Sequence, residues 1–332
     1  MQPITIADVA AATGVSRTTV SHVFSGHRPV RQETRELVLR VAREMGYRPS
    51  AVAKSLRARR TNTVMIVIPD IMNPFYPGFA RGVQDVVSQQ GYHALLCNTD
   101  AVEASERGYI EDALARRVDG VVFVGFRVPI SDLDILTEVG TAVVAVGPAP
   151  EETMVDTVWL DDVAFSREAT AYLLRKGLGP VAHITGPTDT AVEVKREIGF
   201  RQAHADAGLE VHEDLIVSEE FTHQGGIEGM TALLAGPTRP RSVFCANDLI
   251  ALGAMRVAHE HGLRVPEDIA FVGVDDIDMA AIANPSLTTV RLRIHELGTI
   301  CGRRLLERLN GDWTGNGRSM ALDAELVVRE SA

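Results

Sequence analysis

The sequence predicts a small all-α helix-turn-helix domain followed by a two-lobed α/β body made of doubly wound parallel sheets. Apolar residues at helical spacing near the N-terminus, interrupted by a short turn, indicate the first part. Short apolar runs that alternate with longer amphipathic stretches from Thr61 onward, in two successive sets, indicate the second. Two such sets predict two lobes with a ligand-binding cleft at the carboxyl ends of their strands.

The composition fits this architecture and divides it into a basic and an acidic part. The chain has 332 residues, 45% hydrophobic and 23% charged, which excludes a disordered or fibrous protein. Its net charge is −11, yet residues 1–60 hold eleven Lys or Arg against four Asp or Glu, which leaves +7 on the head and −18 on the remainder. A basic head on an acidic body favours attraction of nucleic-acid phosphates by one end only.

Cysteine usage and hydropathy bear on the cellular compartment. Cys97, Cys245 and Cys301 are widely spaced in apolar surroundings, so we expect reduced core thiols, with no disulfide and no metal site. No apolar run reaches membrane-spanning length, and the N-terminus has no signal-peptide core. We therefore expect a cytoplasmic protein with no membrane partner.

The N-terminal stretch predicts two helices joined by a turn. The first spans 6–13 and the second 17–24, and Gly14 can bend the chain between them. Thr5 and Ser16 can cap these helices, because each side-chain oxygen can pair with the free amides of the first turn.

The polar residues of the second helix fall on one side of it. Arg17, Thr18, Ser21 and His22 lie at or near the helix start, at spacings of one, four and five. This is the part of a recognition helix that meets base edges in the major groove. The alternative is a helical hairpin whose polar residues are merely solvated. The agreement of caps, turn, apolar spacing and local charge favours nucleic acid.

A third helix is predicted over 32–45, and the segment after it is ambiguous. Residues 50–57 predict a short helix that is marginal alone. This segment could be a flexible linker with some helical tendency. It could also be a hinge that orders only when paired with its twin on DNA, with Leu56 as an apolar wedge in the minor groove. The segment itself leaves the two hypotheses nearly even, and its neighbours favour the hinge.

The first sixty residues resemble the DNA-binding head of the lactose/galactose-repressor (LacI/GalR) family of transcription factors. The motifs that carry the resemblance are Ile6-Ala7-Asp8-Val9-Ala10, Gly14-Val15-Ser16, Thr19-Val20-Ser21, Glu33-Thr34-Arg35, Gly46-Tyr47-Arg48-Pro49 and Ala53-Lys54-Ser55-Leu56-Arg57. Several spaced motifs in the right order are far more specific than any one of them.

The resemblance implies a helix-turn-helix domain over 1–48 and a hinge helix over 49–60. It also implies that Arg17, Thr18 and His22 read bases and that Leu56 opens the central base step. The full set of expected DNA contacts is Thr5, Ser16, Arg17, Thr18, Ser21, His22, Ala53, Leu56 and Arg57.

Strands and helices alternate in the body. The continuous apolar run at 63–68 is typical of a parallel strand covered on both faces. Further strands are predicted at 93–97, 121–124, 142–146, 181–185, 242–245, 269–274 and 324–328. Helices are predicted at 76–90, 103–116, 131–139, 165–176, 195–207, 226–234 and 249–261.

The family resemblance extends over this body and so covers nearly the whole chain. Its motifs here are Asn73-Pro74-Phe75-Tyr76, Gly91-Tyr92, Asn98-Thr99-Asp100, Val118-Asp119-Gly120, Asn247-Asp248, Pro266-Glu267-Asp268-Ile269, Val274-Asp275-Asp276 and Pro285-Ser286-Leu287-Thr288-Thr289-Val290. They imply a periplasmic-binding-protein-like body whose chain crosses between lobes near residues 162, 291 and 321. The first lobe would then comprise 61–162 plus 292–321, including a helix at 293–310, and the second 163–291 plus 322–332.

Several side chains could hold a ligand in the cleft. Asn73, Phe75 and Tyr76 follow the first strand, where an aromatic ring could stack on a sugar or a base, although Phe75 or Tyr76 could equally belong to the core. Arg127 follows another strand and could hydrogen-bond a polar ligand or simply be solvated.

In the second lobe the resemblance implies that Arg196, Phe221 and Asp275 contact the ligand. Asp275 with Arg196 would offer an acceptor and a forked donor for neighbouring hydroxyls, or form an internal ion pair that closes the empty cleft. Asn247 also follows a strand and joins the ligand set, although helix capping is its more ordinary role. Phe165 stands where the family usually has a small residue, which puts any inherited ligand identity in doubt.

The alternative to a regulator is a small-molecule-binding α/β enzyme with an appended DNA-binding head. The phosphate-binding, nucleophile-elbow and zinc-protease motifs do not occur, and His259-Glu260-His261 has the wrong spacing for a helical metal pair. A plain ligand-binding protein would explain the body and not the head. We therefore expect a transcriptional repressor without cofactor or metal, binding a palindromic operator in double-stranded DNA and controlled by a sugar-like effector. No heptad pattern follows the last strand, so we expect a homodimer.

Overall fold

The computed structural model describes residues 4–25, 28–48, 60–125, 127–148 and 152–332. It divides the chain into two compact units, residues 1–62 and 63–332, and each is described by itself. The predicted hinge helix, with Ala53, Leu56 and Arg57, lies outside the described residues. None of the helices in the described part of the chain is long and apolar enough to cross a membrane.

The head contains three helices around one small core. They are α1 (Ile6–Thr13), α2 (Arg17–Ser25) and α3 (Gln32–Glu44), within one residue of the predicted ends. The core between them is made of Val9, Ala10, Val20, Val23, Val38 and Ala42. Apolar side chains at helical spacing on all three helices therefore meet, as the amphipathic pattern predicts.

Local hydrogen bonds determine where the first two helices begin. The Asp8 carboxylate accepts from the backbone amide of Thr5 at 2.8 Å and from its hydroxyl at 2.7 Å. The Ser16 hydroxyl accepts from the backbone amide of Thr19 at 3.0 Å. Gly14 has φ +66°, a left-handed conformation that favours glycine, and it turns the chain from α1 into α2. Both predicted caps are confirmed. Ser16 accepts from a backbone amide directly, and Thr5 forms a capping box with Asp8.

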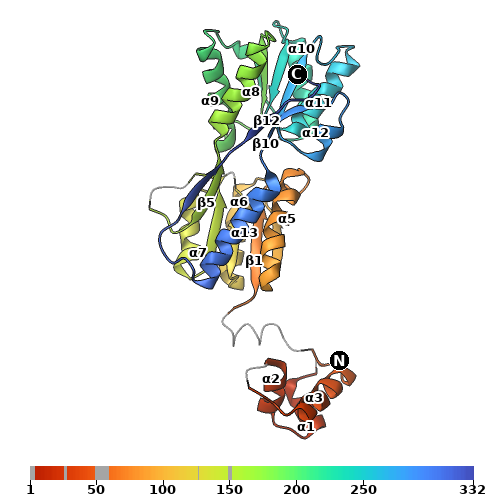
Figure 1. Cartoon of the computed structure of the whole chain (residues 1–332), viewed down its shortest axis with the longest axis vertical. Coiled ribbons are helices and arrows are strands. Elements are labelled where there is room, and N and C mark those ends of the chain that lie inside the picture. The colour runs from red at the N-terminus through yellow and green to blue at the C-terminus, as the bar shows by residue number, and fades with distance from the viewer. Residues whose placement is uncertain (1–3, 26–27, 49–59, 126, 149–151) are drawn as a thin grey trace. The chain divides into compact units, whose positions relative to one another are not determined.

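The first lobe of the body is a six-stranded sheet in the order β11-β5-β4-β3-β1-β2. Its strands are β1 (Thr63–Ile68), β2 (His93–Asn98), β3 (Gly120–Phe123), β4 (Ala142–Val146), β5 (Asp156–Leu160) and β11 (Ser319–Leu322). Its helices are α5 (Phe75–Val87), η1 (Ser88–Gln90), α6 (Glu103–Arg116), η2 (Ile130–Leu133), α7 (Asp134–Glu138) and α13 (Ile294–Asn310). Figure 1 labels β1 and β5 in this lobe, together with α5 and α13. Side chains of β1 point alternately into two cores, one under α5 and α13 and the other under α6 and α7.

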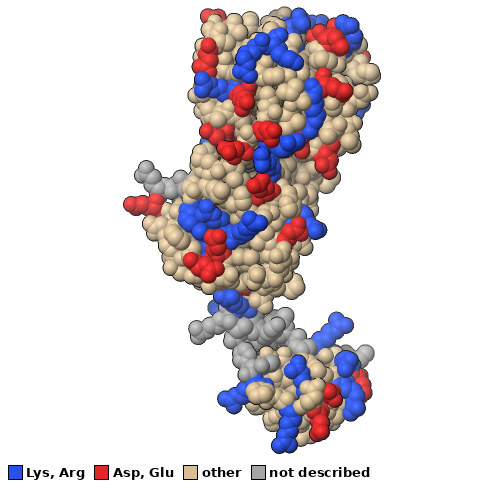
Figure 2. Space-filling model, in the orientation of Figure 1, with Lys and Arg blue, Asp and Glu red and all other residues tan. Residues whose placement is uncertain are grey.

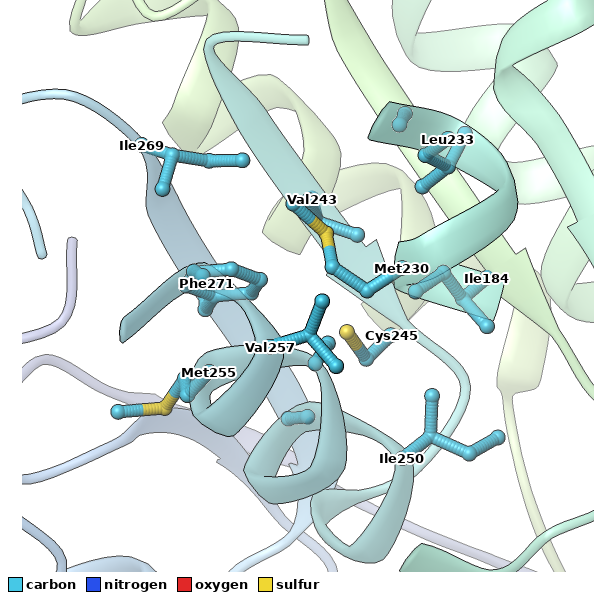
Figure 3. Close-up of a cluster of buried hydrophobic side chains, with 14 of the residues drawn as sticks. Ile184, Met230, Leu233, Val243, Cys245, Ile250, Met255, Val257, Ile269 and Phe271 are labelled. Atoms are coloured by element: carbon cyan, nitrogen blue, oxygen red, sulfur yellow. The ribbon is translucent and has the colours of Figure 1, made fainter. Parts of the chain in front are cut away.

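The second lobe also has a six-stranded sheet with a hydrophobic core on each face, and its strand order is β12-β10-β9-β8-β6-β7. Its strands are β6 (Val181–Thr185), β7 (Ile216–Ser218), β8 (Ser242–Cys245), β9 (Ala270–Asp275), β10 (Thr288–Arg291) and β12 (Glu325–Val327). Its helices are α8 (Asp162–Arg175), α9 (Ala191–Asp206), η3 (Glu213–Leu215), α10 (His223–Ala235), α11 (Asp248–Glu260) and α12 (Asp278–Ile282). Figure 3 shows the core on one face, where Met230, Val243, Cys245 and Val257 come together from α10, β8 and α11.

The chain passes between the two sheets three times. It leaves the first sheet after β5, returns through α13 after β10, and crosses again between β11 and β12. The pairing of β10 with β12 is antiparallel, so the second sheet is not purely parallel as predicted.

Each lobe holds its C-terminal strand with one aspartate between two arginines. In the first lobe the buried Asp156 on β5 accepts from Arg308 and Arg318, each at 2.7 Å. In the second lobe Asp276 accepts from Arg291 at 2.6 Å and from Arg329 at 2.5 Å. These clusters join segments that are far apart in sequence, which is how the short strands β11 and β12 are secured to their sheets.

Candidate DNA-binding and ligand-binding sites

The first candidate site is the outward face of α2. Ser16, Arg17 and Thr18 are exposed at its start, and Ser21 and His22 are partly exposed one turn further on. Val20 and Val23 lie on the opposite face, in the core. The helix thus presents the residues predicted to contact DNA on the side away from the rest of the head.

The seven arginines between positions 17 and 48 form no salt bridge within the described part of the head. Over residues 4–25 and 28–48, no carboxylate pairs with any of Arg17, Arg28, Arg31, Arg35, Arg40, Arg43 and Arg48. In the body, by contrast, many arginines are paired with Asp or Glu. Figure 2 shows Lys and Arg predominating over Asp and Glu on the visible face of the head. Guanidinium groups that form no salt bridge can bind phosphates without first breaking one.

The second candidate site is a cavity of about 490 Å³ between the two lobes of the body. It lies at the carboxyl ends of the parallel strands, where ligands bind in doubly wound folds. The structure brings all the predicted ligand residues to its walls: Asn73, Phe75, Tyr76, Arg127, Arg196, Phe221, Asn247 and Asp275.

Arg196 is held by Asp162 and by the carbonyl of Ala246, both in the second lobe. Its Nε donates to Asp162 at 3.0 Å, and its Nη1 donates to the carbonyl of Ala246 at 2.5 Å. The guanidinium also lies 5.5 Å from the centre of the Phe165 ring. The alternative of an internal Arg196–Asp275 ion pair does not occur among the described residues, because α8 brings Asp162 closer to the guanidinium. Burial is the largest influence on the Arg196 pKa and would lower it, but Asp162 and Glu193 outweigh burial and raise it.

Asp275 reaches the cavity from the end of β9. The residue is 95% buried, with φ +118°, and no described residue donates a hydrogen bond to its carboxyl group. Burial raises the pKa of Asp275 well above its usual range, and the nearby Asp248 adds to the shift while Arg196 opposes it. A protonated Asp275 can both donate and accept hydrogen bonds, which suits hydroxyl groups.

Asn73 and Asn247 line the cavity but also support the backbone around it. The Asn247 amide oxygen accepts from the backbone amide of Ile250 at 2.8 Å, and its nitrogen donates to the carbonyl of Phe221 at 3.3 Å. The Asn73 oxygen accepts from the backbone amide of Phe75 at 3.0 Å. The capping role expected of Asn247 is confirmed, and it limits how many hydrogen bonds this side chain can offer a ligand.

The two aromatic residues after β1 belong to both the core and the cavity. The rings of Phe75 and Tyr76 pack edge to face, with centroids 5.1 Å apart. Tyr76 is buried in the first-lobe core and Phe75 packs at its margin, while both face the cavity. Burial raises the pKa of Tyr76, so its hydroxyl remains protonated. Membership of the core and contact with a ligand, the two interpretations left open for Phe75 and Tyr76, are therefore compatible.

Arg127 joins the lobes beside the cavity. Its Nη1 pairs with Asp189, which precedes α9 in the second lobe, and its Nε donates to the carbonyl of Ala101 at 3.3 Å. The buried Glu106 accepts from the backbone amides of Arg127 and Val128, at 3.2 and 2.8 Å. Arg127 is thus anchored in the first lobe while its charge reaches the second.

Some residues that line the cavity were not among those predicted from the sequence. Trp159 lines the cavity at the end of β5, and its indole nitrogen donates to Ser319 on β11 at 3.1 Å. Lys195 and Asp162 also reach the walls. Trp159 was missed because β5 was not predicted, although an isolated tryptophan beside a short apolar run was an available signal.

An outward helix with polar residues at its start and an inter-lobe cavity lined by polar and apolar side chains in one chain define a DNA-binding regulator that senses a small molecule. Residues 5–50 match the bacterial regulatory proteins of the lacI family, and residues 170–332 match the periplasmic binding protein-like domain. The HTH-type transcriptional repressor CytR of Escherichia coli (strain K12) is 32% identical, over 98% of this chain and 96% of its own length.

Two solved structures are similar over almost the full length. The complex of the transcriptional regulator CelR with cellobiose is 34% identical, covers 99% of this chain and all of its own, and has a TM-score of 0.74. The Lac repressor dimer bound to operator and the anti-inducer ONPF is 24% identical, covers 99% of both chains, and shares the fold with a TM-score of 0.83. This chain belongs to the lacI family of bacterial transcriptional regulators. The resemblance and the fold class predicted from the sequence are confirmed.

Proposed function

We propose that this regulator is a repressor whose homodimer binds a palindromic operator and whose operator affinity depends on a sugar-like ligand in the inter-lobe cavity. The observation that carries the proposal is the outward, polar start of α2, on a head whose arginines between positions 17 and 48 form no salt bridge with the described residues. Two copies would place two such helices in successive major grooves. The relatives are named as regulators, and no enzymatic step is part of this proposal.

The DNA contacts divide by chemistry. Arg17, Thr18 and His22 would read base edges, because they project from the first two turns of α2. Thr5, Ser16 and Ser21 would donate to phosphates and set the orientation of the head. Ala53, Leu56 and Arg57 would act at the minor groove at the operator centre.

The ligand contacts would come from both lobes. Asp275 and Arg196 would hydrogen-bond adjacent hydroxyls, and Phe75 and Phe221 would lie against the ring. Tyr76, Asn73, Asn247 and Arg127 would complete the walls. The cellobiose held by CelR supports a sugar-like ligand for this cavity.

Selection of operator sequences from random double-stranded DNA tests the proposal. Full-length protein should enrich a palindrome, and Arg17→Ala should weaken binding to it by about 1–3 kcal/mol while relaxing the preference at one position of each half-site. Arg175→Ala, an equivalent change at an exposed position at the end of α8 in the body, should leave binding unchanged. Enrichment of no palindrome, or equal losses in both variants, would contradict the proposal.

A further inference from the structure

The two walls of the cavity differ in chemistry. The first-lobe wall is largely aliphatic and includes Val124, Val128, Pro129, Ile130, Val146 and Pro148. Its one charged side chain among the described residues, Arg127, is already paired with Asp189 and with the carbonyl of Ala101. Its other polar side chains are Asn73, Tyr76 and Ser131, and the Asn73 oxygen already accepts from the backbone amide of Phe75. Most of this wall is therefore apolar.

The second-lobe wall carries the charge. It presents Asp162, Lys195, Arg196 and Asp275 from α8, α9 and the end of β9. Arg196 is positioned by Asp162 and by the carbonyl of Ala246, and the Asp275 carboxyl has no hydrogen-bond donor among the described residues. A buried acid without a partner, aimed into a cavity, requires a polar group on the ligand.

Aromatic rings complete the first-lobe side. Trp159 and Phe75 both line the cavity there, and the Trp159 nitrogen is bonded to Ser319, so its hydrogen-bonding capacity is used within the protein. Its remaining surface can only make apolar or stacking contacts. A ligand with hydroxyl groups on every side would leave many of them against the aliphatic and aromatic side chains of this wall, which cannot hydrogen-bond them.

We propose that the ligand is amphipathic: a hydroxyl-bearing ring bound by Asp275 and Arg196, carrying an aromatic or branched apolar group that packs on the first-lobe wall. This inference rests on the proposed function only in taking the cavity as the effector site. The cavity volume of about 490 Å³ suits such a two-part molecule, because pockets of roughly 300–1,000 Å³ hold drug-sized ligands.

Paired probes test the inference directly. Methyl and phenyl β-D-glucoside, methyl and phenyl β-D-galactoside, and ribose and adenosine are titrated into the full-length Trp313→Phe protein. Trp159 is then the sole tryptophan and reports from the cavity wall. In at least one pair the member with the apolar group should bind about tenfold more tightly or better, since it buries a ring that its partner lacks.

A variant of the apolar wall supplies the second measurement. In Ile130→Gln, the probe with the apolar group should bind only about threefold more tightly than its partner, or less. The dissociation constant of the plain sugar should stay unchanged, because the substitution alters only the first-lobe wall. Ile135→Gln, an equivalent change at an exposed site on α7, should have no effect.

Three outcomes overturn the inference: equal affinities within every pair, no binding by any of the six probes, or an unchanged advantage in Ile130→Gln. Operator selection with the same protein separates these outcomes from failure of the proposed function. An enriched palindrome with equal affinities within the pairs refutes only the amphipathic ligand. Tight binding of an apolar member without any enriched palindrome refutes only the regulatory role.

Discussion

Asp248 shows how one buried carboxyl group makes stability depend on pH. It lies under the sheet of the second lobe, where it accepts from the Thr289 hydroxyl at 2.6 Å and from the backbone amide of Ile277 at 2.9 Å. Burial raises the pKa of Asp248 from 3.8 to about 7, although these hydrogen bonds partly oppose the shift. The folded protein therefore keeps a proton that the unfolded chain releases near pH 4.

The contribution of Asp248 to stability should accordingly fall as the pH rises. Between pH 3.8 and about 7 the folded state binds more protons at Asp248 than the unfolded state does, so this contribution to the free energy of unfolding decreases across the range. The buried His183 acts in the opposite direction, because burial lowers its pKa to about 4. Across the same range, the free energy of unfolding of Asp248→Asn should therefore fall less, or rise more, than that of the unchanged protein. Denaturant unfolding at several pH values measures the effect, with the exposed Asp214→Asn as control. An unchanged pH dependence in Asp248→Asn would refute this account.

At the scale of elements, the crossing of α5 and α13 depends on glycines at the contact. A Cβ added to Gly82 would lie 2.2 Å from the carbonyl oxygen of His295, and one added to Gly298 would lie 2.1 Å from that of Phe79. Both obstacles are backbone atoms, so neither can rotate away. The close approach also positions the start of α5, and with it Phe75 and Tyr76 in the cavity wall.

Gly298→Ala should therefore destabilise the body. We expect a loss of about 1–3 kcal/mol in the free energy of unfolding, because the helices must separate to admit the methyl group. Gly108→Ala is the matched control, since a Cβ at this helical position meets no atom within 4 Å. It should stabilise the protein by about 0.5–1 kcal/mol through helix propensity. Equal changes in the free energy of unfolding for the two variants, measured by chemical denaturation, would show that the close contact between α5 and α13 does not determine the stability of the body.

Elements that depend on local pattern were predictable from the sequence, and those that depend on distant partners were not. The strands at Thr63–Ile68 and Ala142–Val146 are apolar runs and occur as predicted. Strand β5 begins with Asp156, a charge that only Arg308 and Arg318 make tolerable in the interior. β7, β10, β11 and α12 were missed for related reasons, since they are short and are secured by the sheet or by neighbouring loops.

The position of the candidate ligand site was predictable from the sequence, but the hydrogen-bond partners of its residues were not. Polar residues at the carboxyl ends of strands had to meet at one edge, and the predicted set does meet there. The partner of Arg196 depends on where α8 begins, and the sequence carries no local signal for that contact. The bond between Trp159 and Ser319 likewise links residues that are 160 positions apart.

At the scale of the whole molecule, ligand response and DNA binding should be separable by substitution. Asp275→Asn replaces the carboxyl group that faces the cavity and leaves the head untouched. Operator affinity without ligand should stay the same, and the change in affinity caused by a ligand found in a thermal-shift screen should shrink from about 1–3 kcal/mol toward zero. Fluorescence anisotropy of labelled operator measures both quantities, with Asp278→Asn on α12 as control. A full ligand response in Asp275→Asn would remove this residue from the proposed site.

The three passages of the chain between the lobes have a mechanical consequence. A body with one connection could twist and bend in many directions, but here the segments after β5, β10 and β11 run between the sheets together. Any relative movement must bend all three, which leaves essentially one rotation as the soft degree of freedom. A ligand that favours one end of that rotation acts on the whole body at once. Ligand binding should therefore shift the body between two conformations and not through a continuous range of lobe angles.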